Sequence, residues 1–212
     1  MSRMIFILSL IIFTSCTQQE KKSNAKSDLS IFKEAYDKAA ASDIVLDTIF
    51  LGLRFGMNKE EMHDHLREMA YKGKLEANNI EGYQYLLATD NNSTVRASLS
   101  ADFFEEKLYK FTLNFQDYRS NGIPISVDEK YMVNRAKSLF VMKYPINKDN
   151  FNGYYYTLEG IGLFSCFINK NMVVEFNPWG SMSYINAPIE IKKDAAEKNK
   201  DKQKIKETIS DL

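Results

Sequence analysis

The segments 93–103, STVRASLSADF, and 108–116, LYKFTLNFQ, alternate apolar and polar residues along their whole length. Successive side chains of a strand point to opposite faces, so this alternation predicts two strands with one apolar and one polar face. Residues 105–107 between them are the expected hairpin connection. The predicted apolar face comprises Val95, Ala97, Leu99, Ala101 and Phe103 in the first strand and Tyr109, Phe111, Leu113 and Phe115 in the second.

The elements before this hairpin complete a module. A shorter apolar run at 83–88 predicts a third strand, and Asn58 with Glu61 forms a capping box that opens a helix. An apolar stripe of Met62, Leu66 and Met69 runs along that helix, and Gly73 ends it. We expect the stripe to cover the apolar face of the sheet.

The same order of elements returns in the second half of the chain. Ser126 and Glu129 predict a second capped helix that stops near Tyr144. Three predicted strands follow at 153–160, 161–169 and 171–178. The apolar positions of the helix are Met132, Ala136, Leu139 and Phe140. The sequence therefore predicts an α+β protein of tandem modules, each a helix with a three-stranded antiparallel sheet, at 29–120 and 121–190.

Three further segments complete this plan: two lie at the start of the first module, and one follows the second module. Residues 29–42 predict a short amphipathic helix, with Leu29, Phe32 and Tyr36 at helical spacing. The β-branched residues of 44–57 favour an extended segment. Residues 191–212 mix lysines and acids with few large apolar residues, which predicts a solvated helix or a disordered tail.

The first 28 residues predict where the chain is held. Arg3 precedes an apolar run from Met4 to Phe13, which is too short to span a membrane and is typical of a signal peptide over 1–15. The end of this run, Phe13-Thr14-Ser15-Cys16, resembles the lipobox of bacterial lipoproteins. The resemblance implies a triacylated Cys16 that anchors the chain to a membrane, with 16–28 as a flexible tether. An ordinary signal peptide is the alternative. Because Thr17 is not aspartate, the outer membrane is favoured.

Composition and cysteine use exclude several classes of protein. With 28 basic and 28 acidic residues, the chain has no net field that favours nucleic acid. If Cys16 carries lipid, Cys166 is the only thiol, and no intramolecular disulfide can form. Phe164, Cys166 and Ile168 share one face at period two, which favours a buried cysteine over a reactive one.

Candidate catalytic and metal sites are few. His63 and His65 are the only histidines, and on a helix they point about 160° apart because each residue turns about 100°. We therefore interpret them as solvated and expect no metal, no cofactor and no catalytic residue. Glu61 with His65 would share a helix face as a weak two-ligand pair.

Aromatic residues mark the candidate binding positions. Residues 154–156 are three tyrosines, and Trp179 lies in the segment 176–180, FNPWG. Tyrosine and tryptophan bury a large rigid area and keep a polar tip, which suits interfaces. Tyr155 and Trp179 are the predicted binding residues; the alternative is that the tyrosines pack in the core.

One stretch carries a family resemblance. The pattern Gly52-x-x-x-Gly56-Met57-x-Lys59-x-Glu61, which opens a helix followed by an antiparallel sheet, resembles small envelope lipoprotein modules. These modules are related to the SmpA/OmlA outer-membrane assembly lipoprotein and to the β-lactamase-inhibitor-protein fold. The resemblance implies an α+β interaction module, in tandem, without catalysis. Residues 69–73 depart from the family's Gly-x-Pro after the helices.

The sequence leads to three hypotheses about function. The first is a lipid-anchored, non-catalytic envelope protein that binds a protein partner. The alternative is a small-ligand-binding lipoprotein that uses the concave face of the sheet. The third is an envelope hydrolase in which Glu61 or His65 would take part.

Overall fold

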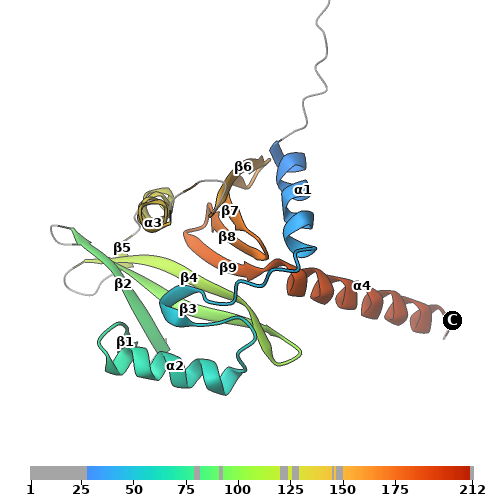
Figure 1. Cartoon of the computed structure of the whole chain (residues 1–212), viewed down its shortest axis with the longest axis horizontal. Helices are drawn as coiled ribbons and strands as arrows, with labels where there is room; N and C mark the ends of the chain where they lie inside the picture. Colours follow the sequence, from blue (N-terminus) through green and yellow to red (C-terminus); the bar gives the residue numbers. More distant parts are fainter. Residues whose placement is uncertain are drawn as a thin grey trace, which may run out of the picture.

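The computed structural model describes residues 28–78, 82–90, 93–119, 124–125, 129–144, 146 and 150–210. These residues form an α+β fold in which helices pack on both faces of one antiparallel sheet (Figure 1). The helices are α1 (Asp28–Ala40), the 3₁₀ helix η1 (Phe50–Gly52), α2 (Lys59–Tyr71), α3 (Glu129–Lys143) and α4 (Ala187–Ser210). The strands are β1 (Glu76–Asn78), β2 (Gly82–Asp90), β3 (Ser93–Phe104), β4 (Lys107–Arg119), β5 (Pro124–Ile125), β6 (Asn152–Leu158), β7 (Gly162–Asn169), β8 (Met172–Asn177) and β9 (Ser181–Asn186).

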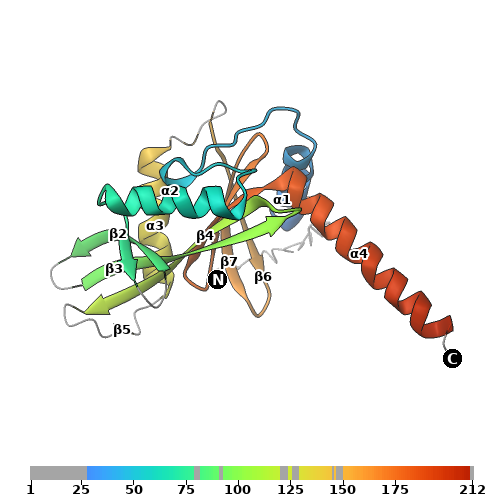
Figure 2. The same cartoon turned by 90° about the horizontal axis from the view of Figure 1, so that it is seen from below.

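The strands of both halves belong to a single sheet. Its order is β1-β2-β3-β4-β9-β8-β7-β6, and β5 pairs with the end of β4. The halves meet where β4 pairs with β9, with Phe111 opposite Tyr184 and Leu113 opposite Met182. In Figure 2, β2–β4 run roughly horizontally and β6–β7 run roughly vertically, so the sheet twists strongly between its two ends.

The central hairpin confirms the alternation. β3 and β4 pair antiparallel, and Glu105 and Glu106 connect them with φ of 49° and 63°. Two consecutive positive φ values are those of a type I′ hairpin turn. One predicted position is wrong: the register shifts between Asp102 and Phe103, so that Leu108 joins the core cluster and Tyr109 does not. This β-bulge adds one residue to β4 and reverses the alternation at that point.

The helix before the hairpin also confirms its predicted caps. The Asn58 side chain accepts from the Glu61 N–H at 2.9 Å, and the Glu61 carboxylate accepts from the Asn58 N–H at 2.8 Å. At the other end, Gly73 has a φ of 69°, and the N–H of Lys74 donates to the carbonyl of Met69. That bond, with the N–H of Gly73 donating to Ala70, is the Schellman arrangement.

The prediction of an extended segment at 44–57 is wrong. The segment is a loop around η1. An isolated bridge joins Thr48 and Arg54, and Gly56 and Met57 each share one backbone hydrogen bond with Leu108 of β4. Leu51 and Gly52 have φ of 53° and 84°, which lie in the left-handed region and not in the β region. The apolar residues there, including the fully buried Leu53, pack into the core without forming a ladder.

The second group of strands has four members, not three. Its first three strands lie as predicted, but β9 is an additional strand. All six residues of β9 are buried. On α3, Val133, Ala136 and Phe140 are buried. Ser126 and the side chain of Met132 lie outside the described residues.

Two hydrophobic cores lie on opposite faces of the sheet. The larger core takes Met62 and Leu66 from α2, Phe140 from α3, and residues from both halves of the sheet such as Phe111 and Tyr184. The smaller core packs α1 on the other face of β6–β9 (Figure 2). Its members are Phe32, Ala39, Tyr156, Phe164, Cys166, Ile168, Val173, Ile185 and Ala187. The strands β7–β9 are therefore covered on both faces, whereas the second face of β3 and β4 is polar.

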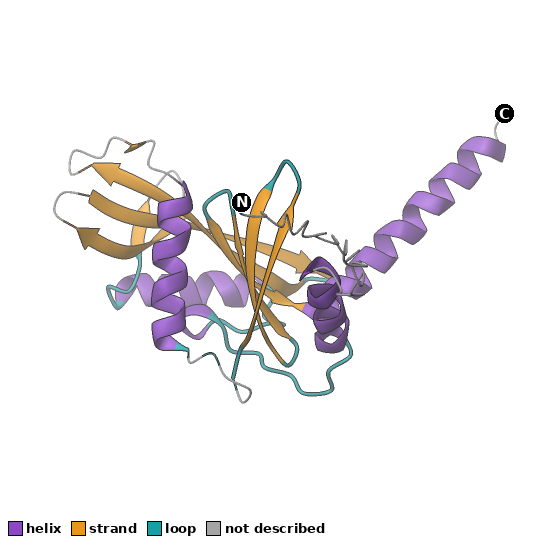
Figure 3. Cartoon of the chain, turned by 90° about the horizontal axis from the view of Figure 1, so that it is seen from above, coloured by secondary structure: helices purple, strands orange, loops and turns teal. Residues whose placement is uncertain are grey.

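The charged tail is a helix that begins at Ala187, earlier than predicted. Ala187 is buried in the smaller core, and the Tyr36 hydroxyl of α1 donates to the Glu190 carboxylate. Beyond this first turn α4 extends away from the sheet (Figure 3). None of the helices within the described ranges is both long and apolar enough to cross a membrane.

Candidate binding groove and aromatic surface

The predicted lipid attachment site, Cys16, lies outside the described residues, as do the signal peptide and residues 16–27 of the tether. The described chain begins at α1, whose Phe32 ring stacks on Tyr156 of β6 with centroids 4.6 Å apart. The N-terminal end of the described chain therefore lies on the face of the sheet that α1 covers.

Cys166 is a buried core residue. Its side chain is fully buried and unpaired with another cysteine. Burial raises the pKa of the thiol, and nearby Glu175 raises it further, while a hydrogen bond from Tyr156 opposes the shift. A thiol that is buried and held protonated is a poor nucleophile. The prediction of a core cysteine is confirmed.

The candidate residues on α2 have structural partners. His65 Nε2 lies 2.9 Å from the Leu51 carbonyl oxygen, so the prediction that both histidines are solvated is wrong for His65. This contact holds the positive-φ turn at Leu51 and Gly52 against α2. Glu61 is engaged in the capping box. Glu61 and His65, the residues of the predicted hydrolase site, therefore do not point together into one cleft.

Metal ligands do not gather in the part of the chain that the structure describes. No group of three or more His, Cys, Asp and Glu side chains is placed to hold an ion there. A partly buried carboxylate, Glu175, lies on the face that α1 covers. Burial raises its pKa, Lys110 opposes the shift, and Glu190 of α4 adds to it.

The two predicted binding residues are exposed but do not form one site. Tyr155 is 51% exposed and Trp179 is 59% exposed. Tyr155 contacts Phe167 on the face that belongs to the larger core, whereas Trp179 contacts Phe164 on the face that belongs to the smaller core. The sheet therefore separates them.

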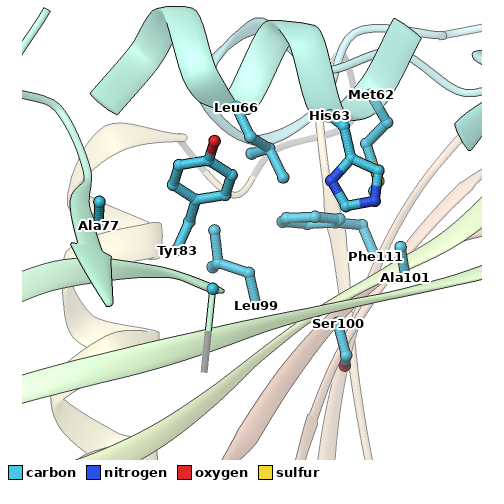
Figure 4. Close-up of a pocket in the computed structure, with 10 residues that line it drawn as sticks. Met62, His63, Leu66, Ala77, Tyr83, Leu99, Ser100, Ala101 and Phe111 are labelled. Carbon is cyan, nitrogen blue, oxygen red and sulfur yellow. The ribbon is translucent and has the colours of Figure 1, made fainter. Parts of the chain in front are cut away.

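A groove lined mainly by apolar side chains lies between α2 and the sheet (Figure 4). It has a volume of about 370 Å³. Leu99, Ala101 and Phe111 form its floor, and α2 forms one wall. The lining residues are Met62, His63, Leu66, Ala77, Gly82, Tyr83, Leu99, Ser100, Ala101 and Phe111.

The polar groups of the groove lie at its rim. In Figure 4 the ring of His63 lies above Ala101 and the hydroxyl of Tyr83 points toward α2, while the Ser100 side chain points away on the other side of the sheet. Among the residues that the structure describes, no acidic residue, lysine or arginine lines the groove. The arrangement suits an uncharged, apolar group with one or two hydrogen-bonding atoms.

Sequence reasoning did not find this groove because it results from missing side-chain volume. Ala77, Gly82 and Ala101 occupy positions where larger residues would fill the space between α2 and the sheet. The available signal was the two alanines at 97 and 101 among larger residues of the apolar face. Ala97 is fully buried, whereas Ala101 faces the groove.

Comparisons of this chain with protein-family models, with curated proteins and with solved structures found no match. The resemblance to the SmpA/OmlA-type modules thus stays a prediction.

Proposed function

We propose that the chain is a lipid-anchored, non-catalytic protein of the bacterial envelope, with the outer membrane favoured, that acts by binding a protein partner. The lipid on Cys16 and the tether would hold the folded domain near the membrane. The partner would place an apolar side chain in the α2 groove. The observation that carries this proposal is the groove itself, a hollow whose described lining residues are mainly apolar and include no acidic residue, lysine or arginine.

The groove has the properties of a pocket for an interface anchor. Aromatic side chains bury roughly 150–250 Å² each, and the residues that dominate interfaces sit in desolvated pockets ringed by weaker contacts. Tyr83 and His63 would hydrogen-bond polar atoms of the partner around such an anchor. An exposed aromatic ring of the partner is therefore the expected occupant.

We further propose that the two halves are modules of one plan. Each half contributes one helix to the larger core, α2 from the first half and α3, which lies against β4, β8 and β9, from the second. In the second half the larger Phe140, Phe167 and Phe176 pack together. Under this proposal, the first half has an open groove between its helix and the sheet, whereas large side chains fill the corresponding space in the second half.

A small apolar ligand is the second candidate occupant. Small-molecule pockets measure about 300–1,000 Å³, and this groove lies at the lower end of that range. The test begins with a defined probe, the uncharged fluorescent amine N-phenyl-1-naphthylamine. We expect saturable binding that Ala101→Phe abolishes by filling the groove. Ser100→Phe is the matched control: Ser100 borders the groove, but its side chain points away to the opposite face of the sheet (Figure 4), so this variant should bind normally.

The occupant is then identified with the native lipidated protein. We would purify it in mild detergent, together with the Ala101→Phe and Ser100→Phe forms, and analyse each by mass spectrometry. A near-stoichiometric envelope protein that is lost only from Ala101→Phe would support the partner proposal. A bound small molecule with the same dependence would favour the ligand alternative. Normal probe binding by Ala101→Phe would contradict both.

The anchor is tested separately. The full chain carrying Cys16→Ala should fold with an unchanged circular dichroism spectrum and leave the membrane fraction. Retention of this variant in the membrane fraction would contradict lipid anchoring at Cys16.

A further inference from the structure

The two outer strands of the sheet differ in how their edges are protected. β1 has three residues, and its Glu76 pairs with Arg96 of β3 at 3.1 Å. β6 has seven residues, NGYYYTL, with neither a charge nor a proline. It pairs with β7 in an unbroken register from Asn152 to Leu158, so it has no bulge. Within the described ranges, β6 pairs only with β7.

An edge of this kind favours pairing with another strand. Alternate residues of an edge strand present N–H and C=O groups that face away from the sheet. Natural proteins protect such edges with short strands, charged residues, proline or bulges. β1 uses two of these devices and β6 uses none. α1 does not replace them, since its Phe32 ring packs on Tyr154 and Tyr156 and thus covers a face of β6.

We propose that β6 pairs with β6 of a second copy of this chain. The two strands run antiparallel about a two-fold axis at Tyr155, the middle residue of β6, and the two sheets become one. This inference does not depend on the α2 groove, which lies at the other end of the sheet.

A second copy is the occupant that the residues of β6 fit best. A two-fold axis at Tyr155 brings this residue next to Tyr155 of the second copy and sets Tyr154 opposite Tyr156 of the second copy. Aromatic cross-strand pairs are favourable. A charged residue on β6 would face a like charge of the second copy across the axis and oppose pairing. β6 carries no charged residue.

Side chains beside the edge extend the contact. Tyr155 and Leu163 share one face, since Leu163 lies opposite Thr157 across β6 and β7. They are 51% and 53% exposed. The two-fold axis joins these two apolar side chains with those of the second copy in one patch, which adds apolar area to the strand pairing. Two-fold dimers with self-complementary patches are the commonest soluble oligomers.

The test uses the full chain carrying Cys16→Ala, which cannot receive lipid. Sedimentation velocity between about 1 and 100 µM would resolve monomer from dimer in the range of weak specific interfaces. We expect a dimer that Tyr155→Lys and Tyr155→Glu each abolish, because like charges meet at the axis. Tyr71→Lys is the matched control: Tyr71 is 94% exposed on α2, and its replacement should leave the dimer intact.

A mixing experiment gives the sharpest outcome. Equal amounts of the Tyr155→Lys and Tyr155→Glu variants should form a mixed dimer, since opposite charges then meet at the axis. A native chain that stays monomeric throughout the range would overturn the proposal. So would a dimer that persists in both Tyr155 variants, or a mixture that remains monomeric.

Discussion

Replacing Asn171 with alanine should detach the loop at 44–57 from the sheet. Asn171 lies in the turn between β7 and β8 and is fully buried. Its Oδ1 accepts from the Leu46 N–H at 2.5 Å, and its Nδ2 donates to the Leu46 carbonyl at 3.1 Å. One side chain thus satisfies both backbone groups of a residue 125 positions away.

The expected loss follows from these two bonds. Each hydrogen bond contributes about 1 kcal/mol net, and a buried polar group left without a partner costs about 1–3 kcal/mol. Because Leu46 is only partly buried, water would relieve some of this cost. We therefore expect Asn171→Ala to lower the free energy of unfolding by about 2–4 kcal/mol, or the melting temperature by roughly 5–15 °C for a chain of this size.

Equilibrium unfolding in guanidinium chloride, followed by circular dichroism, measures the loss. Asn199→Ala is the matched control, because Asn199 is exposed on α4 and alanine is the better helix former there. Hydrogen exchange at the Leu46 amide reports the local effect and should accelerate in Asn171→Ala. A change below about 0.5 kcal/mol with unaltered exchange would refute the reasoning, since surface substitutions already reach that value.

Two further predictions concern a carboxyl group and a helix end. Burial raises the pKa of Glu175 above its usual value of 4.5, so the folded protein favours the protonated carboxyl group. The stabilisation from this group is fully present below pH 4.5 and is lost as the pH rises through the pKa of the folded state. Glu175→Gln should therefore lose less stability than the native chain between pH 4 and 8 in urea titrations, while Glu159→Gln in the exposed β6–β7 turn should behave like the native chain. Gly73→Ala should lower the free energy of unfolding by about 1 kcal/mol, because Gly73 has a φ of 69°, which alanine adopts only with strain. A new Cβ would meet no atom within 4 Å, so a steric clash would not contribute to this loss. Equal stability of Gly73→Ala and native protein in thermal unfolding would contradict the strained-backbone explanation.

The parts of the fold that were predictable are those where one face is buried and the other is solvated. The β3–β4 hairpin alternates because its second face is polar, and α2 carries a narrow stripe between its two caps. β9 was missed because its six residues are all buried, which removes the alternation. The loop at 44–57 has the composition of a strand, but its turn at Leu51 and Gly52 is held by His65, a contact that local composition does not encode.

The candidate sites also have features that the sequence predicts and features that depend on the folded chain. The exposure of Tyr155 follows from strand alternation, because it points away from Tyr154 and Tyr156, whereas Cys166 is buried in a strand that is covered on both faces. The separation of Tyr155 from Trp179 does not follow from it, because it depends on how the β8–β9 turn lies across the sheet. The groove depends on three small residues from β1, β2 and β3 that meet only in the folded chain.

The joint between β4 and β9 has a consequence for how the chain folds. Every other pair of neighbouring strands in the order of the described sheet is consecutive in sequence, from β1–β2 to β8–β9. Such local contacts form quickly, whereas β4–β9 must close a loop of more than sixty residues, from Asn114 to Ser181, before it gains any contact. Folding should therefore proceed through two independently formed meanders whose docking limits the rate. A chain cut between β5 and α3 would keep both meanders whole, and the two fragments should reassemble when mixed.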